Sequence, residues 1–330
     1  MKLGLAVDLG PARTPTGRRL RLLQELLTIA DEKGYGTVWV GEHYSSPESS
    51  FHPPAALVAL GFLASLTSLD LGTGVALLGA HSPRRLRYDL EGLVQLTTAH
   101  VHLGIGLGPA NLWTRFGRDA PLEHTVDDLL EELRVEIRSL GDDLHPSRPA
   151  IPILIGGRTP ASARRAASPF DGYILSSTYP FEIVERQVAR YDRQRRDAGL
   201  PADGRRVVVN RFAIASAAPD AARSLADHHL RPALDRYLNM GVIPGWTSAE
   251  TRSDWDRLIR QCCLVGDRDS VRGDLARYRQ AGITEINVRP WFGDLPESAS
   301  LETIALIGDL VGEIEEGRTP VIPGSGELQQ

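Results

Sequence analysis

The chain has 330 residues, an apolar fraction of 42% and a formal net charge of −5 at pH 7. This size and apolar content are sufficient to bury a large core, as in an ordinary globular protein. No block of Lys and Arg residues stands out, so we expect a small-molecule substrate rather than nucleic acid or an anionic membrane as partner. The first residues carry no secretion signal and no apolar run is long enough to span a bilayer, so we expect a cytoplasmic protein.

Short β-rich runs alternate with amphipathic helical patterns along the chain. The strand runs are residues 3–8, 37–41, 71–78, 101–107, 151–155, 172–176, 207–214 and 285–289. The helical patterns cover residues 16–33, 54–67, 84–98, 124–139, 160–167, 181–198, 219–239 and 300–313. Strict alternation predicts one closed parallel sheet surrounded by helices, an α/β fold of the (β/α)8 or TIM-barrel type. A doubly wound open sheet is the alternative.

The connection after the seventh strand is longer than in a plain strand–helix unit. Residues 220–269 leave room for additional helices, with a break at 241–245, so we expect an extra helical segment between strands seven and eight that could cover a pocket. The barrel is predicted to span residues 1–315. Residues 316–330 are rich in Gly, Pro and Gln and are predicted to form a flexible C-terminal tail.

The second predicted strand ends in the sequence Trp-Val-Gly-Glu-His at residues 39–43. A barrel carries its chemistry at the carboxyl ends of its strands, so Glu42 and His43 mark a candidate active site. An imidazole suits proton transfer because its unperturbed pKa is near neutrality. A histidine that only makes hydrogen bonds in a crowded barrel mouth is the alternative interpretation.

The fourth predicted strand carries three glycines at alternate positions, Gly104, Gly106 and Gly108. In a dinucleotide-binding fingerprint the glycines lead directly into a helix, whose N-terminus receives the phosphate. Here Pro109 and a long polar stretch intervene, so that interpretation is not favoured. Glycines at a barrel mouth still permit close approach of a flat ring to the backbone.

Metal and disulfide chemistry find little support in the sequence. His100 and His102 share one face of a strand but have no third ligand nearby, so no metal site is expected. The two cysteines, Cys262 and Cys263, are adjacent and match no metal-binding spacing.

Several motifs occur together in the order that one known family shows. They are the segment 39–44, the pair 71–75 and 80–84, the pair 151–157 and 171–174, and the pair 265–271 and 281–283. On these motifs the chain, from about Leu3 to Leu310, resembles the bacterial luciferase-like, flavin-dependent monooxygenases. The resemblance implies a flavin at the C-terminal mouth of the barrel, with His43 beside the ring in proton transfer. Glu42 is expected to orient His43, to bind the ring or to satisfy a backbone group.

The resemblance also implies which residues hold the flavin. A cis peptide bond is expected at Gly74–Val75, forming with Ala76 a bulge that faces the ring. The phosphate is expected to lie against Gly156, Gly157, Arg158 and Thr159 and against Ser176 and Ser177, where backbone amides, hydroxyls and a guanidinium can converge. For the two serines, capping of the helix near Pro180 is the alternative.

Two cofactors compete within the family: reduced FMN used with O2, and the deazaflavin F420 used for hydride transfer without O2. The F420 branch often has Asp-His where this chain has Glu42-His43, and an acidic residue where it has Pro109, so FMN is favoured. Leu107 stands where the luciferase branch has a phosphate-binding Arg, which argues for lower flavin affinity or for Arg158 as a replacement. A non-catalytic flavin-binding protein or heterodimer partner is the third hypothesis.

The substrate and the partners are also predicted by resemblance. The beginning and end of the chain resemble members from secondary-metabolite pathways, which oxidise apolar or aromatic substrates. Trp113, Trp291 and Phe292 follow strands four and eight and are candidate substrate contacts, as is Arg289, which could hold an acidic group. A separate flavin reductase and a homodimer are expected as well.

Overall fold

A computed structural model describes residues 1–8, 15–44, 55–143, 150–247 and 254–315. Eight parallel strands close into a barrel, in which each strand pairs with its chain neighbour and the last returns to the first. They are β1 (Lys2–Ala6), β2 (Thr37–Val40), β3 (Asp70–Leu77), β4 (Val101–Gly106), β5 (Ile153–Gly156), β6 (Gly172–Leu175), β7 (Val207–Ala215) and β9 (Glu285–Arg289). The predicted (β/α)8 barrel is therefore confirmed, and the open sheet is excluded.

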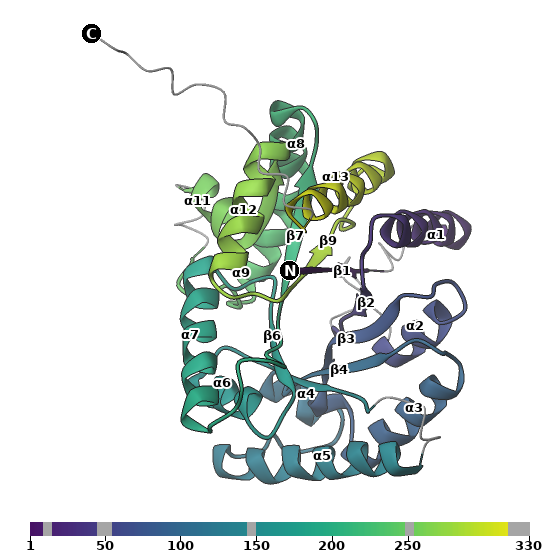
Figure 1. Cartoon of the computed structure of the whole chain (residues 1–330), viewed down its shortest axis with the longest axis vertical. Coiled ribbons are helices and arrows are strands. Elements are labelled where there is room, and N and C mark those ends of the chain that lie inside the picture. Colours follow the sequence, from purple (N-terminus) through teal and green to yellow (C-terminus); the bar gives the residue numbers. More distant parts are fainter. Residues whose placement is uncertain (9–14, 45–54, 144–149, 248–253, 316–330) are drawn as a thin grey trace.

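Helices surround this barrel on the outside (Figure 1). They are α1 (Thr16–Glu32), α2 (Ala56–Leu63), α3 (Pro83–Gln95), α4 (Ala110–Arg115), α5 (Val126–Asp143), α6 (Pro160–Ala167), α7 (Phe181–Asp197), α8 (Pro219–Leu225), α9 (Arg231–Asn239), α11 (Trp255–Cys262), α12 (Arg268–Gln280) and α13 (Glu297–Glu315), with short turns η1 (Leu78–Ala80), η2 (Glu123–Thr125) and the π-helical η3 (Ala226–Leu230). None of the helices in the described residues has both the length and the apolar content needed to cross a membrane.

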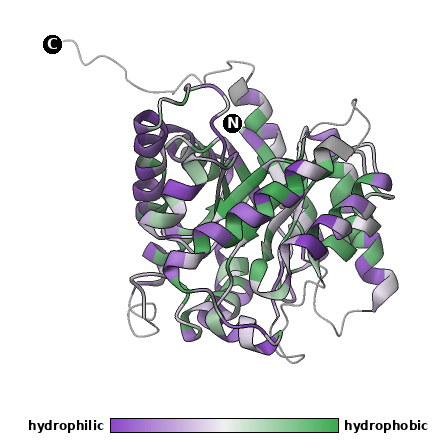
Figure 2. Cartoon of the chain, turned by 90° about the horizontal axis from the view of Figure 1, so that it is seen from below, coloured by the Kyte–Doolittle hydropathy of each residue, from purple (hydrophilic) through white to green (hydrophobic). Residues whose placement is uncertain are grey.

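Side-chain caps and apolar faces explain why these segments are helical. Ser82, Thr159, Asp254 and Asp267 each accept a hydrogen bond from the backbone amide three residues on, which satisfies one free donor of the first turn. Figure 2 shows apolar strands at the centre, with helices that turn polar faces outward. The main core accordingly lies between the sheet and the helices, and a smaller cluster of Ala6, Trp39, Leu154, Ile174 and Val208 fills the barrel interior.

Three elements differ from the sequence-based expectation. Helix α4 begins at Ala110, directly after Pro109, so the expected long non-helical stretch after the glycine run was wrong. A ninth strand, β8 (Cys263–Gly266), pairs only with residues 212–215 of β7, beyond the barrel closure. Helix α12 follows it and also lay outside the predicted pattern.

The extra helical segment between the seventh and eighth barrel strands is present as predicted. It comprises α8, η3, α9 and α11, and it packs around its own apolar cluster against Phe212 and Ile214 on β7. The predicted tail at 316–330 lies outside the described residues, and the domain boundary at 315 stays a prediction.

Candidate active site

A cavity of about 480 Å³ opens at the carboxyl ends of the barrel strands. The described residues that line it lie in the barrel strands, just after them or, as for Tyr237 on α9, on a neighbouring helix. They include Asp8, Trp39, Gly41, Glu42, His43, Gly74, Val75, Leu77, Ile105, Leu107, Ile155, Gly156, Gly157, Arg158, Thr159, Ile174, Ser176, Ser177, Tyr179, Asn210, Tyr237 and Arg289. Its volume is within the range of small-molecule sites, which are mostly apolar with a few placed polar groups.

His43 lies at one wall of this cavity, at the end of β2, and is half-buried. The backbone amide of the preceding Glu42 donates to the carbonyl of Val75 at 3.0 Å, which joins this segment to β3. The peptide bond between Gly74 and Val75 is cis, as predicted, and the pairing of β3 with β4 shifts there. Gly74 and Val75 line the cavity, whereas Ala76 is fully buried behind them.

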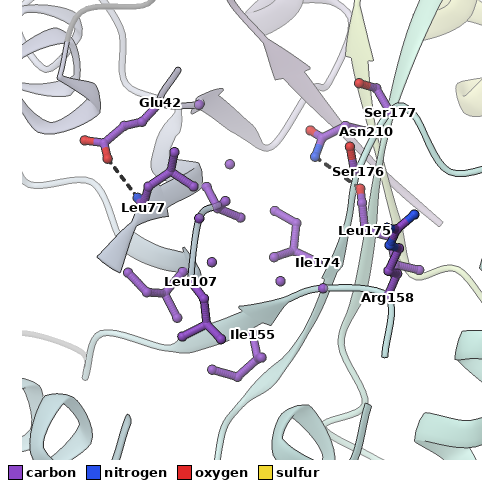
Figure 3. A pocket seen from close by; sticks show the side chains of 18 of the residues that line it. Glu42, Leu77, Leu107, Ile155, Arg158, Ile174, Leu175, Ser176, Ser177 and Asn210 are labelled. Atoms are coloured by element: carbon purple, nitrogen blue, oxygen red, sulfur yellow. Dashed lines mark hydrogen bonds between the residues drawn. The ribbon is translucent and has the colours of Figure 1, made fainter. Parts of the chain in front are cut away.

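Glu42 lies beside His43, but its carboxylate binds other groups. One oxygen accepts from the backbone amide of Ala56 at 3.1 Å and the other from that of Leu77 at 2.8 Å (Figure 3). The Nε2 of His81 is 2.9 Å from both oxygens. The carboxylate thereby joins the ends of β2 and β3 to the start of α2, which matches the predicted role of satisfying backbone groups. No role was predicted for His81, although it stands in the family-like motif at residues 80–84.

Of the residues predicted to hold a phosphate, Arg158, Ser176 and Ser177 lie on the opposite side of the cavity from Glu42 and Leu77 (Figure 3), and Gly156, Gly157 and Thr159 also line the cavity. Gly157 has a φ of +148°, and a Cβ there would come within 2.7 Å of Ser162 Cβ, so only glycine fits. Thr159 caps α6 by accepting from Ser162 N at 3.1 Å. Arg158 is exposed at the rim.

Ser176 and Ser177 line the same side of the cavity, directly after β6. The Ser176 hydroxyl accepts from the backbone amide of Thr178 at 3.2 Å and lies 3.0 Å from the Thr178 hydroxyl. Pro180 occupies the N-cap of α7, and that helix has no side-chain cap. The alternative that the serines cap this helix is therefore excluded.

Arg289 also lines the cavity, at the end of β9. Its Nε donates to the Asp8 carboxylate at 2.7 Å, its Nη1 donates to the Tyr237 hydroxyl at 3.3 Å, and the guanidinium lies 4.6 Å from the ring centre of Phe212. Burial lowers the pKa of Arg289, but Asp8 and Tyr237 outweigh burial and raise it, so the guanidinium stays charged. Because Asp8 balances that charge, Arg289 is poorly suited to hold a free acidic group of a substrate.

The three aromatic side chains predicted to contact substrate are all buried elsewhere. The Trp113 indole donates to the carbonyl of Leu107 at 2.9 Å and lies under Arg118. Trp291 packs in the main core, and Phe292 packs edge-on against Phe212 at 5.1 Å. Among the described residues, the cavity lining does not include these three side chains.

Trp39 is a cavity residue to which the sequence assigned no role of its own. It is 1% exposed, and its indole donates to Glu285 at 2.7 Å inside the barrel. A Cβ at Gly4 or Gly72 would come within 2.7 Å or 2.4 Å of the indole, so these glycines make room for it. His102 stacks on Trp39 at 5.9 Å and binds Arg206 at 3.0 Å, which gives this histidine a packing role.

Asn210 and its neighbour Arg211 were also missed by the sequence analysis. Asn210 lines the cavity and donates to the Leu175 carbonyl at 3.3 Å, while Arg211 is fully buried on the outer side of the cavity wall. Two polar residues inside the apolar run 207–214 were the available signal.

Comparisons with known proteins agree with this arrangement. The luciferase-like monooxygenase family model matches residues 1–285. N-acetyl-S-alkylcysteine monooxygenase of Bacillus subtilis is 29% identical over 196 residues, which is 54% of this chain and 56% of that protein. Three relatives from this bacterium are matched over only 49% to 63% of their own lengths.

Solved structures with the same fold include both oxygen-dependent and F420-dependent enzymes. The monooxygenase RslO1 from Streptomyces bottropensis has a TM-score of 0.76 at 22% identity, over 96% of this chain and 100% of that one. The oxygenating constituent of 3,6-diketocamphane monooxygenase from Pseudomonas putida, in complex with FMN, has 0.72 at 18%, over 94% and 98%. Coenzyme F420-dependent tetrahydromethanopterin reductase from Methanopyrus kandleri has 0.62 at 17%, over 93% and 97%. Since the family model covers well over half of the chain, the protein belongs to the luciferase-like monooxygenase family.

Proposed function

We propose that the protein is a monooxygenase that uses reduced FMN and O2 to oxygenate a small organic substrate, apolar or aromatic and of the secondary-metabolite type. The observation that carries the proposal is that two opposite sides of the same cavity carry different chemical groups. Glu42, which precedes His43 and binds Val75 of the Gly74–Val75 bulge through its amide, stands at one side, and Arg158 and Ser176 stand at the other.

The chemistry of the lining fits a flavin with a phosphate tail. Leu77, Leu107, Ile155 and Ile174 give an apolar surface for a flat ring, as Figure 3 shows. Hydroxyls and a guanidinium at the other side are suitable partners for a phosphate. Bound there, reduced FMN would supply the reducing equivalents for splitting O2. The residues named here would bind and orient it, and the apolar walls would exclude water.

His43 is the group that we assign to proton transfer. It is half-buried, lines the cavity and follows a barrel strand, where positioning is rigid. An imidazole so placed can give or take a proton at the reacting end of the cavity. Glu42, the residue before His43, links this segment to the end of β3 at Leu77 and to the start of α2 at Ala56.

The second candidate is an F420-dependent oxidoreductase, which the similarity to F420-dependent enzymes of the same fold favours. FMN is preferred because Glu42 and Pro109 depart from the F420 pattern. A non-catalytic flavin-binding or heterodimer partner remains the third candidate, against which the retention of His43 argues.

A parallel titration with reduced FMN, oxidised FMN and F420 under anaerobic conditions tests the proposal. We expect reduced FMN to bind more tightly than F420, and admission of air to the complex to give a transient absorbance change before the spectrum of oxidised flavin. Preferential binding of F420 without reaction with O2 would support the second candidate. Binding of none of the three would support the non-catalytic one.

We further propose a homodimer that receives reduced flavin from a separate reductase. Helix α2 is apolar on all sides, and its Val58 and Phe62 are 71% and 42% exposed. Tyr88 on the neighbouring α3 and Leu96 just after it are 56% and 67% exposed. An apolar surface shared by two adjacent helices is typical of an interface between subunits.

Replacing both Val58 and Phe62 by Glu is expected to convert the dimer to a monomer of 36.0 kDa, because two charges would have to be buried at the interface. Light scattering after gel filtration measures the mass. Val135→Glu is the control, since Val135 is 54% exposed but lies on α5. A wild-type monomer, or a double variant that stays dimeric, would contradict this interface.

A further inference from the structure

Arg211 is a fully buried arginine in the middle of β7, between Asn210, which lines the cavity, and Phe212. We propose that Arg211 is a positioning residue for the anionic end of the flavin, acting through the segment 176–179 after β6. The proposal rests on the function proposed above and names a residue that shapes the side of the cavity proposed to hold the phosphate.

The guanidinium holds this segment at both of its ends. Its Nη1 donates to the carbonyl of Ser176 at 3.1 Å, and its Nη2 donates to the carbonyl of Tyr179 at 2.9 Å. Nη1 also donates to the carbonyl of Asn210 at 2.9 Å, and Nε donates to the hydroxyl of Tyr278 on α12. Since Ser176, Ser177 and Tyr179 all line the cavity, the guanidinium sets where their polar groups stand.

The segment between these two anchors is folded on itself. The Ser176 hydroxyl accepts from the Thr178 amide and lies within hydrogen-bond distance of the Thr178 hydroxyl. Ser177 is 6% exposed and Thr178 is 4% exposed. A short, buried turn that is fixed at both ends has few alternative conformations, so loss of one anchor changes the position of both serines.

The positive charge of Arg211 also favours binding of an anion at this side of the cavity. Its acceptors among the described residues are three backbone carbonyls and a phenol, without an ion pair. The nearby carboxyl group of Asp274 forms its ion pair with Arg277, at 3.0 Å, and not with Arg211. Burial raises the pKa of Asp274 to about 6, although Arg277 and Arg211 both lower it. A buried positive charge behind the loop therefore favours an anion in front of it.

Lysine at position 211 separates geometry from charge. An ammonium keeps the positive charge, but it cannot span two carbonyls as the planar guanidinium does. Arg195 provides a matched control, because it is also buried and donates to the carbonyls of Pro201 and Asp203, at 2.7 Å and 3.3 Å, in a loop that does not line the cavity. Arg211→Lys and Arg195→Lys each remove a buried guanidinium that binds a pair of loop carbonyls.

The test compares FMN with riboflavin, which lacks the phosphate, both in the reduced state and under anaerobic conditions, by titration of the wild type and both variants. We expect Arg211→Lys to weaken FMN binding about tenfold more than riboflavin binding, and Arg195→Lys to leave the ratio of the two affinities unchanged. If Arg211→Lys does not fold, Tyr278→Phe is used instead, because it removes one acceptor of the guanidinium. It should lower the ratio of FMN affinity to riboflavin affinity by a smaller factor.

The outcomes distinguish this inference from the function on which it rests. Tight FMN binding by the wild type with an unchanged ratio in Arg211→Lys, or in Tyr278→Phe where that variant replaces it, would overturn the role of Arg211 and leave the proposed function standing. Binding of neither flavin by the wild type would overturn both.

Discussion

Replacing His43 by Ala is expected to lower turnover by about 10²- to 10⁴-fold, the usual contribution of a positioned general acid or base. Flavin affinity should change little, because the proposed phosphate side lies across the cavity from Glu42, the chain neighbour of His43. The measurement is steady-state oxygenation with saturating reduced FMN, together with an anaerobic flavin titration of the same variant.

His124→Ala is the matched control for His43. It removes an exposed imidazole on η2 that is not part of the described cavity lining, so its turnover should equal that of the wild type. A His43→Ala enzyme with wild-type turnover would remove His43 from the chemistry. A parallel loss of flavin affinity would instead assign the residue to binding.

Replacing Glu42 by Ala is expected to destabilise the protein by about 3 kcal/mol, because the backbone amides of Ala56 and Leu77 and the imidazole of His81 lose their acceptor. Glu42→Gln should cost about half as much, since an amide keeps one acceptor oxygen. Chemical denaturation followed by circular dichroism gives the free energy of unfolding.

Glu136→Ala serves as the control for Glu42. Glu136, whose side chain is 19% exposed, pairs with Arg84, whose side chain is 76% exposed, and a pair with one partner in solvent contributes about 0–1 kcal/mol. If Glu42→Ala is as stable as Glu136→Ala, the hydrogen bonds of Glu42 do not hold the ends of β2 and β3 together. If its stability falls but Glu42→Gln keeps turnover, Glu42 acts through structure alone.

The barrel strands could be predicted because each is a short apolar run bounded by turn residues and buried by helices outside. Residues 101–107 were predicted as a strand, and β4 is Val101–Gly106. Helix α12 was not predicted, because its buried residues are only Val271, Leu275 and Tyr278 and many of the others are charged. Strand β8 was missed because it begins at Cys263, directly after α11 ends at Cys262, so no turn residue marks its start.

The candidate site was predictable only where its residues are local to a strand end. His43 lies three residues after the end of β2 at Val40, and the Gly74–Val75 bulge lies within β3. Trp113, Trp291 and Phe292 also follow strands, yet their direction depends on packing with distant segments, such as Phe212 against Phe292. The links from Arg211 to Ser176 and Tyr179 join residues more than thirty positions apart and have no sequence signature.

The helical segment between β7 and β8 has its own apolar cluster and meets the barrel through Phe212 and Ile214, which lie on the same face of β7 as the cavity residue Asn210. From this segment Tyr237 reaches the cavity, whereas the proposed phosphate side is built from residues after β5 and β6. Changes in the two parts are thus separable in this architecture. Under the proposed function, insertions or substitutions in α8 and α9 would reshape what the cavity accepts while the loops proposed to face the flavin keep their supports, so selection would act on substrate range and on flavin retention through different stretches of the gene.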